Sequence, residues 1–141
     1  MAANNPQCCG LDTSVVLRLL IGKPENQALA AKKLIEDAAR DGRAIMISDL
    51  VVAESYFALH FHYRVPKNEA LRSLLELIES GVVRGQENGV AASAIKSTLA
   101  ASNKIGFLDR MIHAQYRMMP AIMASFEKPA TRLEGTEVLT G

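Results

Sequence analysis

The chain has 141 residues, 49% of them hydrophobic, and it carries 16 Lys and Arg residues against 15 Asp and Glu residues. This length and composition predict a single domain, residues 1–141, with a core large enough to fold without disulfides or a structural metal. The nearly balanced charge gives no general support for binding to nucleic acid or to a membrane surface. Any nucleic-acid binding must therefore come from local patches.

The cysteines and the N-terminus indicate the compartment. Cys8 and Cys9 are adjacent, which places them poorly for a mutual disulfide or a tetrahedral zinc site. We interpret them as small core residues of a reduced, cytoplasmic protein. Residues 1–7 are polar and lack the basic and apolar regions of a signal peptide, so we expect a flexible N-terminal extension. No apolar run is long enough to cross a membrane.

The apolar pattern predicts strands and helices that alternate along the chain. In order, the expected elements are a strand at 8–11, helices at about 14–21 and 26–41, a strand at 44–47, helices at about 49–63 and 71–80, a strand at 82–83, helices at about 88–99 and 109–118, and strands at 120–124 and 136–139. This order predicts an α/β fold with a central parallel sheet of about four to five strands and helices on both faces.

Four acidic residues occupy positions where such a fold places its chemistry. Asp12 follows the first strand, and α/β folds bind their ligands at the carboxyl ends of parallel strands. Glu54 shares an apolar, buried-looking helical face with Phe57, and no basic residue lies within a turn or two to pair with it. Asp109 begins another helix, and Glu127 follows a fourth apolar strand. Together these acids predict a site for a hard cation.

Each acid also has a structural explanation. Asp12 and Asp109 precede helices, where a carboxylate caps free backbone N–H groups, and Asp49 has the same role at the next helix. Glu54 would need a distant cationic partner, and Glu127 would be a solvated loop residue. The functional interpretation is strongest for Glu54, because an unpaired buried carboxylate is costly.

The motifs around these acids resemble those of PIN-domain ribonucleases, in particular the VapC-type toxins of prokaryotic toxin–antitoxin pairs. Residues 11–20 are similar to the family's first strand and helix, residues 47–54 to the segment with its second acid, and residues 107–115 to its third motif. In the last motif, Ser125-Phe126-Glu127 carries a Glu where the family usually has an Asp. The resemblance implies a three-layer α/β/α PIN-like fold.

The resemblance further implies a metal-dependent endoribonuclease that uses Mg2+ to hydrolyse phosphodiester bonds in single-stranded or structured RNA. Asp12 and Asp109 would be direct metal ligands, Glu54 a ligand directly or through water, and Glu127 an outer-sphere or second-metal group. Mg2+ prefers oxygen ligands and Mn2+ can substitute for it. The cation would polarise the scissile phosphate and lower the pKa of a bound water.

Four further residues are predicted to contact the substrate. Ser14 would hydrogen-bond a carboxylate or a phosphate, although a hydroxyl is also a common helix-start residue. Lys104, Arg110 and Lys128 lie close in sequence to the acids and would contact RNA phosphates, whereas a solvated surface is the default for such residues. The resemblance also implies a homodimer and an antitoxin protein that covers the active-site groove, and no membrane partner is expected.

Two other functions stay open at this level. Glu at position 127 is compatible with a catalytically weakened PIN-like module that binds RNA or protein. A receiver-like, phosphate-binding switch would also place an acid at Asp12, but the chain lacks a glycine-rich phosphate loop and a recognisable later Lys.

Overall fold

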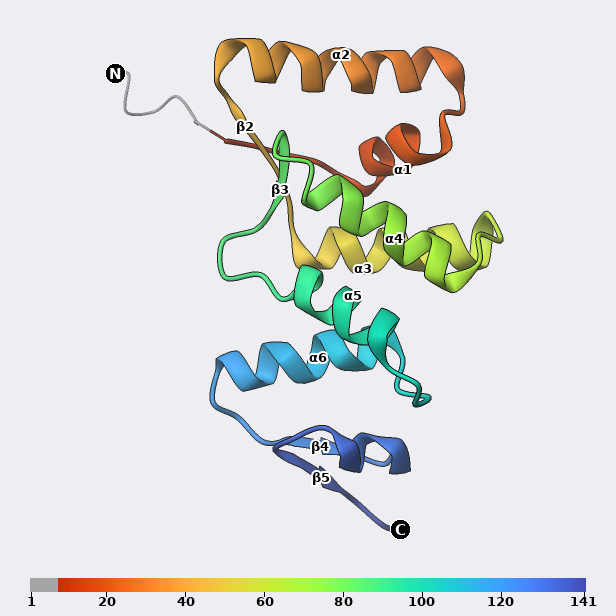
Figure 1. Cartoon of the computed structure of the whole chain (residues 1–141), viewed down its shortest axis with the longest axis vertical. Coiled ribbons are helices and arrows are strands. Elements are labelled where there is room, and N and C mark those ends of the chain that lie inside the picture. The colour runs from red at the N-terminus through yellow and green to blue at the C-terminus, as the bar shows by residue number, and fades with distance from the viewer. Residues whose placement is uncertain (1–7) are drawn as a thin grey trace. The chain divides into compact units, whose positions relative to one another are not determined.

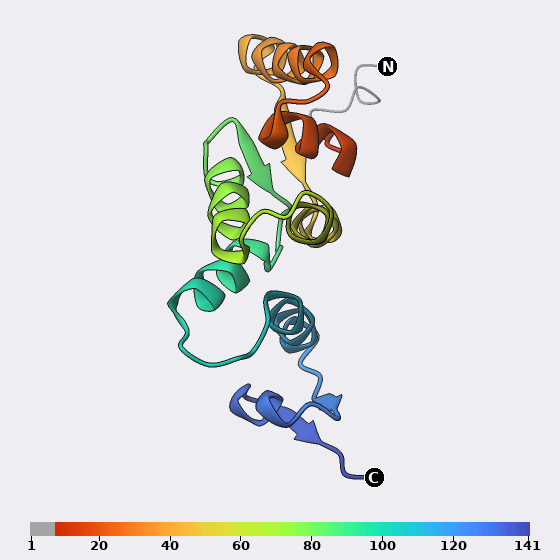
Figure 2. The ribbon, with the colours of Figure 1, turned by 90° about the vertical axis from the view of Figure 1, so that its right-hand side faces the viewer.

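The computed structural model describes residues 8–141, and the predicted N-terminal extension, residues 1–7, lies outside the described residues. The chain forms two compact units, the first ending at Gly89 and the second comprising Val90–Gly141. Figures 1 and 2 show the elements of both units in two views. The prediction of a single domain stays a prediction.

The first unit contains a three-stranded parallel sheet with the strand order β1-β2-β3 (Figure 1). Helix α1 contacts α2 and α3, α2 contacts β2, and α4 contacts β3. In chain order, the elements are β1 (Cys8–Gly10), α1 (Thr13–Ile21), α2 (Glu25–Asp41), β2 (Ala44–Ile47), α3 (Asp49–Phe57), η2 (Ala58–His62), α4 (Lys67–Ile78) and β3 (Val83–Gly85).

Strand β2 is the centre of this sheet, and its core residues follow from the sequence. Ile45 pairs with Cys9 on one side and with Val83 on the other. The predicted parallel strand is confirmed, with Ile45 and Ile47 fully buried on one face and Ala44 and Met46 half-buried on the other. Cys8 is exposed and Cys9 is half-buried, so the interpretation of the cysteines as core residues is wrong. The physical reason is that β1 packs mainly against β2, and no described helix covers its side chains as α4 covers β3.

Helix α3 begins at Asp49 as predicted, but its N-cap residue and its end differ from the prediction. Ser48, not Asp49, is the N-cap: its Oγ accepts a hydrogen bond of 3.2 Å from the backbone N–H of Val51. Asp49 is the first helical residue, and its side chain is buried. The α-helical pattern ends at Phe57 and continues as the π-helical turn η2, in which the Tyr63 N–H donates to the carbonyl of Ala58. The predicted α-helix 49–63 is therefore wrong beyond residue 57.

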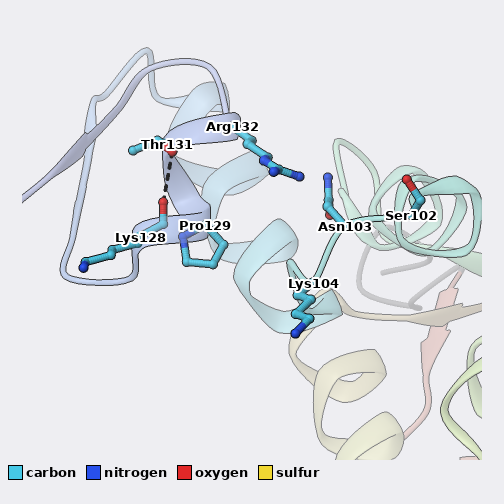
Figure 3. A pocket seen from close by; sticks show the side chains of 7 residues that line it. All are labelled: Ser102, Asn103, Lys104, Lys128, Pro129, Thr131 and Arg132. Atoms are coloured by element: carbon cyan, nitrogen blue, oxygen red, sulfur yellow. Dashed lines mark hydrogen bonds between the residues drawn. The ribbon is translucent and has the colours of Figure 1, made fainter.

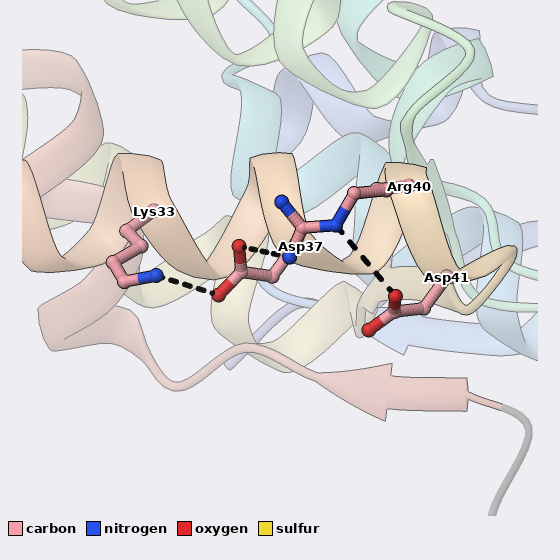
Figure 4. A network of polar contacts seen from close by, with 4 residues as sticks. All are labelled: Lys33, Asp37, Arg40 and Asp41. Atoms are coloured by element: carbon pink, nitrogen blue, oxygen red, sulfur yellow. Dashed lines mark hydrogen bonds and ion pairs between the residues drawn. The ribbon is translucent and has the colours of Figure 1, made fainter.

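The exposed face of α2 carries a network of ion pairs (Figure 4). Asp37 accepts hydrogen bonds from Lys33 Nζ at 3.2 Å and from Arg40 at 2.8 Å, and Arg40 Nε lies 3.8 Å from Asp41. The hydrogen bond from Lys33, supported by Arg40, lowers the pKa of Asp37 below its usual value. The pairs Lys33–Asp37 and Asp37–Arg40 have the i,i+4 and i,i+3 spacings that support an exposed helix, so they explain these charges on α2 without a ligand.

The second unit contains two helices, a short 3-10 helix and a parallel pair of strands. Its elements are α5 (Ala91–Ala100), α6 (Phe107–Met118), β4 (Met123–Ser125), η3 (Lys128–Arg132) and β5 (Thr136–Val138). Strands β4 and β5 pair with Met123 opposite Thr136. A small core connects the strands to η3; it consists of Ile105, Met123, Ala130 and Leu133.

Three boundaries in this unit correct the prediction. Helix α5 begins at Ala91 rather than Asn88, because Asn88 has a φ of 61° and is not helical. Helix α6 begins at Phe107, so Asp109 is its third residue and does not open it. Strand β4 covers residues 123–125 instead of 120–124, because the Ala121 N–H donates to the carbonyl of Tyr116 in a turn after α6.

The pairing of the strands supports the predicted fold class. The five strands of residues 8–141 all pair in parallel, three in the first unit and two in the second. Helices separate them in sequence, as in an α/β protein. None of the helices in the described part of the chain is long and apolar enough to span a bilayer.

Candidate functional site

Asp12 is the N-cap residue of α1, but its carboxylate does not cap the helix. Its backbone carbonyl accepts the first helical hydrogen bonds, from the N–H groups of Val15 and Val16. The carboxylate Oδ2 instead accepts a hydrogen bond of 3.0 Å from the hydroxyl of Ser14. Asp12 and Ser14 are both exposed. The capping explanation for the Asp12 side chain is therefore wrong.

Glu54 on α3 contacts the start of α1. The Thr13 hydroxyl donates a hydrogen bond to Glu54 Oε1. Thr13 is buried, with 8% of its surface exposed. Because Thr13 directly follows Asp12, this hydrogen bond brings Glu54 to the residue beside Asp12. The first unit thus places the first two predicted acids near each other, on two contacting helices.

The helical face of Glu54 is exposed, which corrects the prediction of a buried face. Glu54 is exposed, and its apolar neighbours on that face, Leu50 and Phe57, are 77% and 49% exposed. The buried residues of α3 are Asp49, Val52, Ser55 and Tyr56. The apolar pattern misled because α3 carries apolar side chains around most of its circumference. The partner of Glu54 is a hydroxyl, not the distant cation that burial would have required.

Asp109 and Glu127 line one pocket in the second unit. Asp109 lies in the first turn of α6, where free backbone N–H groups favour a carboxylate; the N-cap, Gly106, provides no side chain. Glu127 lies between β4 and η3, and its backbone N–H donates to Ser125 Oγ at 3.0 Å. The cavity measures about 240 Å³. Both acids are exposed, and the second unit brings them to a common surface.

The donor chemistry of these residues suits a hard divalent cation. Each unit offers two carboxylates with hydroxyl groups beside them, and Mg2+ prefers such oxygen ligands. Within each unit, as far as residues 8–141 are concerned, no three His, Cys, Asp or Glu side chains form a group that could hold a metal. Mg2+ usually binds through one or two carboxylates, with waters and substrate phosphates as its other ligands, so the pairs fit this ion.

The predicted substrate-binding cations of the second unit have different surroundings. Lys104 and Lys128 line a second pocket, of about 500 Å³. Arg110 does not line it. Its guanidinium instead donates a hydrogen bond of 2.7 Å to Asn103 Oδ1. Arg110 therefore holds a residue of the pocket instead of facing it.

A comparison with protein-family models decides the family. The model described as PIN domain matches residues 10–127 of the chain. The chain belongs to the PIN-domain family. The matched range contains all four predicted acids, and it confirms the predicted three-layer α/β/α PIN-like fold class. No curated protein and no solved structure matches the chain.

Membership of the PIN-domain family supports a nuclease-like module. PIN domains are generally nucleases and typically use divalent metal ions, so the family supports a hydrolase that binds nucleic acid.

Three residues near the predicted site were not singled out from the sequence: Thr13, Asn103 and Arg132. Thr13 binds Glu54, and Asn103 and Arg132 line the pocket with Lys104 and Lys128. Two signals were available: Thr13 is adjacent to Asp12, and Arg132 follows Lys128 by four residues. Asn103 gave no signal, because an Asn in a loop is usually a turn residue.

Proposed function

We propose that this PIN domain is a Mg2+-dependent endoribonuclease that hydrolyses phosphodiester bonds in RNA. The observation that carries the proposal is the carboxylate of Asp12, which stands at an N-cap position but binds Ser14 instead of the helix backbone. A side-chain cap typically contributes about 1 kcal/mol to stability. A carboxylate withheld from that bond, in a family of nucleases, is better explained by a ligand than by the helix.

The proposed metal-binding carboxylates are Asp12, Asp109 and Glu54, with Glu127 as an outer-sphere or second-metal group. One carboxylate oxygen of Asp12 accepts a hydrogen bond from Ser14, and one carboxylate oxygen of Glu54 accepts a hydrogen bond from Thr13. The other oxygen of each carboxylate has no protein partner among residues 8–141. Hydroxyl donors that fix a ligating carboxylate orient it and tune its affinity for metal. When bound, Mg2+ or Mn2+ neutralises charge on the scissile phosphate and makes water a nucleophile at neutral pH.

The proposed RNA contacts are Ser14, Lys104 and Lys128, and the predicted contact Arg110 is proposed as a positioning residue. Ser14 lies beside Asp12, where it would orient the carboxylate and meet the substrate. Lys104 and Lys128 are exposed and line the same pocket, which supports direct contact with phosphates. Arg110 would act through Asn103, to which its guanidinium is bound.

Cleavage of a single-stranded RNA by the purified protein tests the activity. We expect cleavage with Mg2+ and none with a chelator. Asp12→Asn should slow cleavage by more than about 100-fold, because it removes the negative charge of a carboxylate that is proposed to bind the metal. Asp41→Asn is the matched control, since Asp41 is an exposed acid of the same unit with only a weak contact to Arg40. Wild-type cleavage by the Asp12 variant would contradict the proposal, and RNA binding without cleavage would favour a binding module.

We further propose that the protein is the toxin of a toxin–antitoxin pair. In this role, the protein would form a homodimer in the cytoplasm and bind an antitoxin protein. The similarity of residues 11–20, 47–54 and 107–115 to VapC-type motifs supports the toxin role. Induced expression should arrest growth, and co-expression of a neighbouring small gene should relieve the arrest. Arrest by the Asp12→Asn variant as well would show that nuclease activity is not its cause.

A further inference from the structure

A positively charged pocket in the second unit is formed by two segments, the loop before α6 and the 3-10 helix η3 (Figure 3). Its lining residues are Ser102, Asn103, Lys104, Lys128, Pro129, Thr131 and Arg132. Three of these are cationic and none is acidic. Lys104, Lys128 and Arg132 are exposed, and none forms an ion pair with an acid of residues 8–141. The lining of the pocket is therefore positively charged, and its cations are not held in ion pairs.

The orientation of Asn103 adds directional donors to that charge. Its Oδ1 accepts two hydrogen bonds, from the backbone N–H of Ile105 at 3.2 Å and from the Arg110 guanidinium at 2.7 Å. Both donors require the oxygen of the amide at that position, which fixes the amide group. Figure 3 shows the Asn103 nitrogen and the Arg132 guanidinium pointing toward one another. Both groups only donate, so they cannot bond each other.

A phosphate is the ligand that matches two facing donors in a cationic pocket. Its oxygens only accept, and one phosphate can accept from a guanidinium and an amide at the same time. The volume of about 500 Å³ lies within the range of roughly 300–1,000 Å³ that is usual for ligand pockets. A carboxylate ligand would match the charge, but it offers fewer oxygens to satisfy donors from two segments.

We propose that this pocket binds a phosphate group of RNA, with Asn103 and Arg132 donating to its oxygens and Lys104 and Lys128 adding positive charge. The proposal deepens the proposed function and rests on it for the assignment of the phosphate to RNA. Arg110 is a positioning residue that orients Asn103. An internal phosphodiester and a terminal phosphate present the same oxygens, and the experiment below distinguishes them.

The two pockets of the second unit have lining residues that are consecutive in the sequence, which supports this assignment. Lys128 directly follows Glu127, and Glu127 lines the acidic pocket with Asp109. Adjacent Cα atoms are about 3.8 Å apart, so a single peptide bond connects a residue of the acidic pocket to a residue of the basic pocket. An RNA strand that presents one phosphate to the acids would bring a neighbouring phosphate to Asn103 and Arg132. The basic pocket would then hold the strand beside the bond that is cut.

Binding of a short labelled RNA in the presence of a chelator tests the pocket without cleavage. Asn103→Asp keeps the oxygen that Ile105 and Arg110 need, but it replaces the donor that faces Arg132 with a second oxygen and adds negative charge. We expect the affinity to fall about tenfold or more. Arg132→Gln should lower the salt slope by about 0.7, as expected for one lost phosphate contact on a single strand. The matched control is Asn68→Asp on α4, an exposed residue with the same charge change, which should bind like the wild type.

The outcomes separate this proposal from the nuclease proposal. Wild-type affinity in both Asn103→Asp and Arg132→Gln would overturn it, even if the protein cleaves RNA, and so would a wild-type protein that binds no RNA. Weaker binding in these variants supports it even if the wild type cuts nothing. An effect only on RNA with a terminal phosphate assigns the pocket to the strand end; an equal effect on RNA with a terminal hydroxyl assigns it to an internal phosphodiester. If Asn103→Asp fails to fold, the Arg132→Gln variant alone tests the proposal, because Arg132 is exposed and its substitution should not disturb the fold.

Discussion

The hydroxyl of Thr13 donates a hydrogen bond to Glu54 Oε1, an acid 41 positions later in the chain. The bond connects the first residue of α1 to the middle of α3, and Thr13 itself is buried. It gives Glu54 a fixed partner next to Asp12. A hydroxyl that holds a carboxylate from one side leaves the other carboxylate oxygen for a ligand, so Thr13 is a positioning residue in the proposed metal chemistry.

Thr13→Val should separate the positioning role of this hydroxyl from its packing, because Val has nearly the same shape. We expect the free energy of unfolding to fall by roughly 0.5–1.5 kcal/mol and metal affinity to fall by roughly 10- to 100-fold. Thermal melting and a Mn2+ titration measure the two effects. Thr98→Val is the control, since Thr98 donates to the carbonyl of Ala94 within α5. Equal metal affinity in the two variants would exclude the positioning role.

Added Mg2+ or Mn2+ should raise the melting temperature of the wild-type protein, because a ligand that binds only the folded state stabilises it. At a metal concentration 100 times the Kd, the gain is about 2.7 kcal/mol. The gain should shrink in Asp12→Asn and in Glu54→Gln, which each remove one proposed ligand charge. NaCl at matched ionic strength is the control. An unchanged melting temperature at millimolar metal would contradict metal binding by these acids.

Features of the fold that depend on local patterns could be predicted from the sequence. The apolar run Ala44–Ile47 indicated a parallel strand, and the run forms the central strand of its sheet. Ile45 and Ile47 on one face are fully buried, whereas Ala44 and Met46 on the other face are half-buried. The start of α6 was wrong for a physical reason. An acid in the first turn and an acid at the N-cap stabilise the same free N–H groups, so Asp109 gave the same signal two residues inside the helix.

Features that depend on contacts between distant segments could not be predicted. The order of residues placed Glu54 on an apolar face of α3, but only the packing of α1 against α3 shows that this face is exposed and that Thr13 is its partner. Arg110 is similar. Its charge and its place beside Asp109 suggested a phosphate contact, whereas the fold turns its guanidinium to Asn103. The type and sequence position of a residue predict its chemistry, but they do not predict which distant residue it will contact.

Asp109→Asn should impair RNA cleavage more than Glu127→Gln. Asp109 is a proposed direct ligand, so we expect a loss of more than about 100-fold, whereas an outer-sphere Glu127 should cost less than roughly 100-fold. Glu127→Asp, which restores the acid usual in the family's last motif, should cleave at least as fast as the wild type. Initial rates over a range of Mg2+ concentrations measure all three. Glu36→Gln, an exposed acid on α2, is the control. A larger loss in Glu127→Gln than in Asp109→Asn would reverse the assigned roles.

The Asp37 network predicts a pH dependence of stability. Lys33, followed by Arg40, holds the pKa of Asp37 below its ordinary value of 3.8. A carboxyl whose pKa is lower in the folded state stabilises the fold above its unfolded pKa, and this contribution is lost as the pH falls through the folded pKa. Asp37→Asn should therefore melt at a slightly lower temperature than the wild type at pH 7, and the difference should disappear well below pH 3.8. A difference that persists or grows in acid would show that charge is not its cause.

Gly135 predicts a local requirement for glycine in the second unit. Its φ is 74°, which side chains rarely adopt, and a Cβ there would overlap the Arg117 guanidinium. Its carbonyl accepts a hydrogen bond of 3.0 Å from the N–H of Met123, at the start of the β4–β5 pairing. Gly135→Ala should therefore lower the free energy of unfolding by roughly 1–3 kcal/mol, which urea denaturation measures.

Gly81→Ala separates the two causes of that loss. Gly81 has a φ of 87°, but nothing lies within 4 Å of a Cβ built there, so its substitution carries the backbone strain alone. We expect Gly135→Ala to cost only slightly more than Gly81→Ala, because Arg117 is a flexible side chain that is 43% exposed and can move away. Arg117→Ala in the same chain should recover this small excess, since the two residues are in contact and their effects are not additive. Equal losses at the two glycines, with no recovery by Arg117→Ala, would show that the close approach of Arg117 does not constrain the chain before β5.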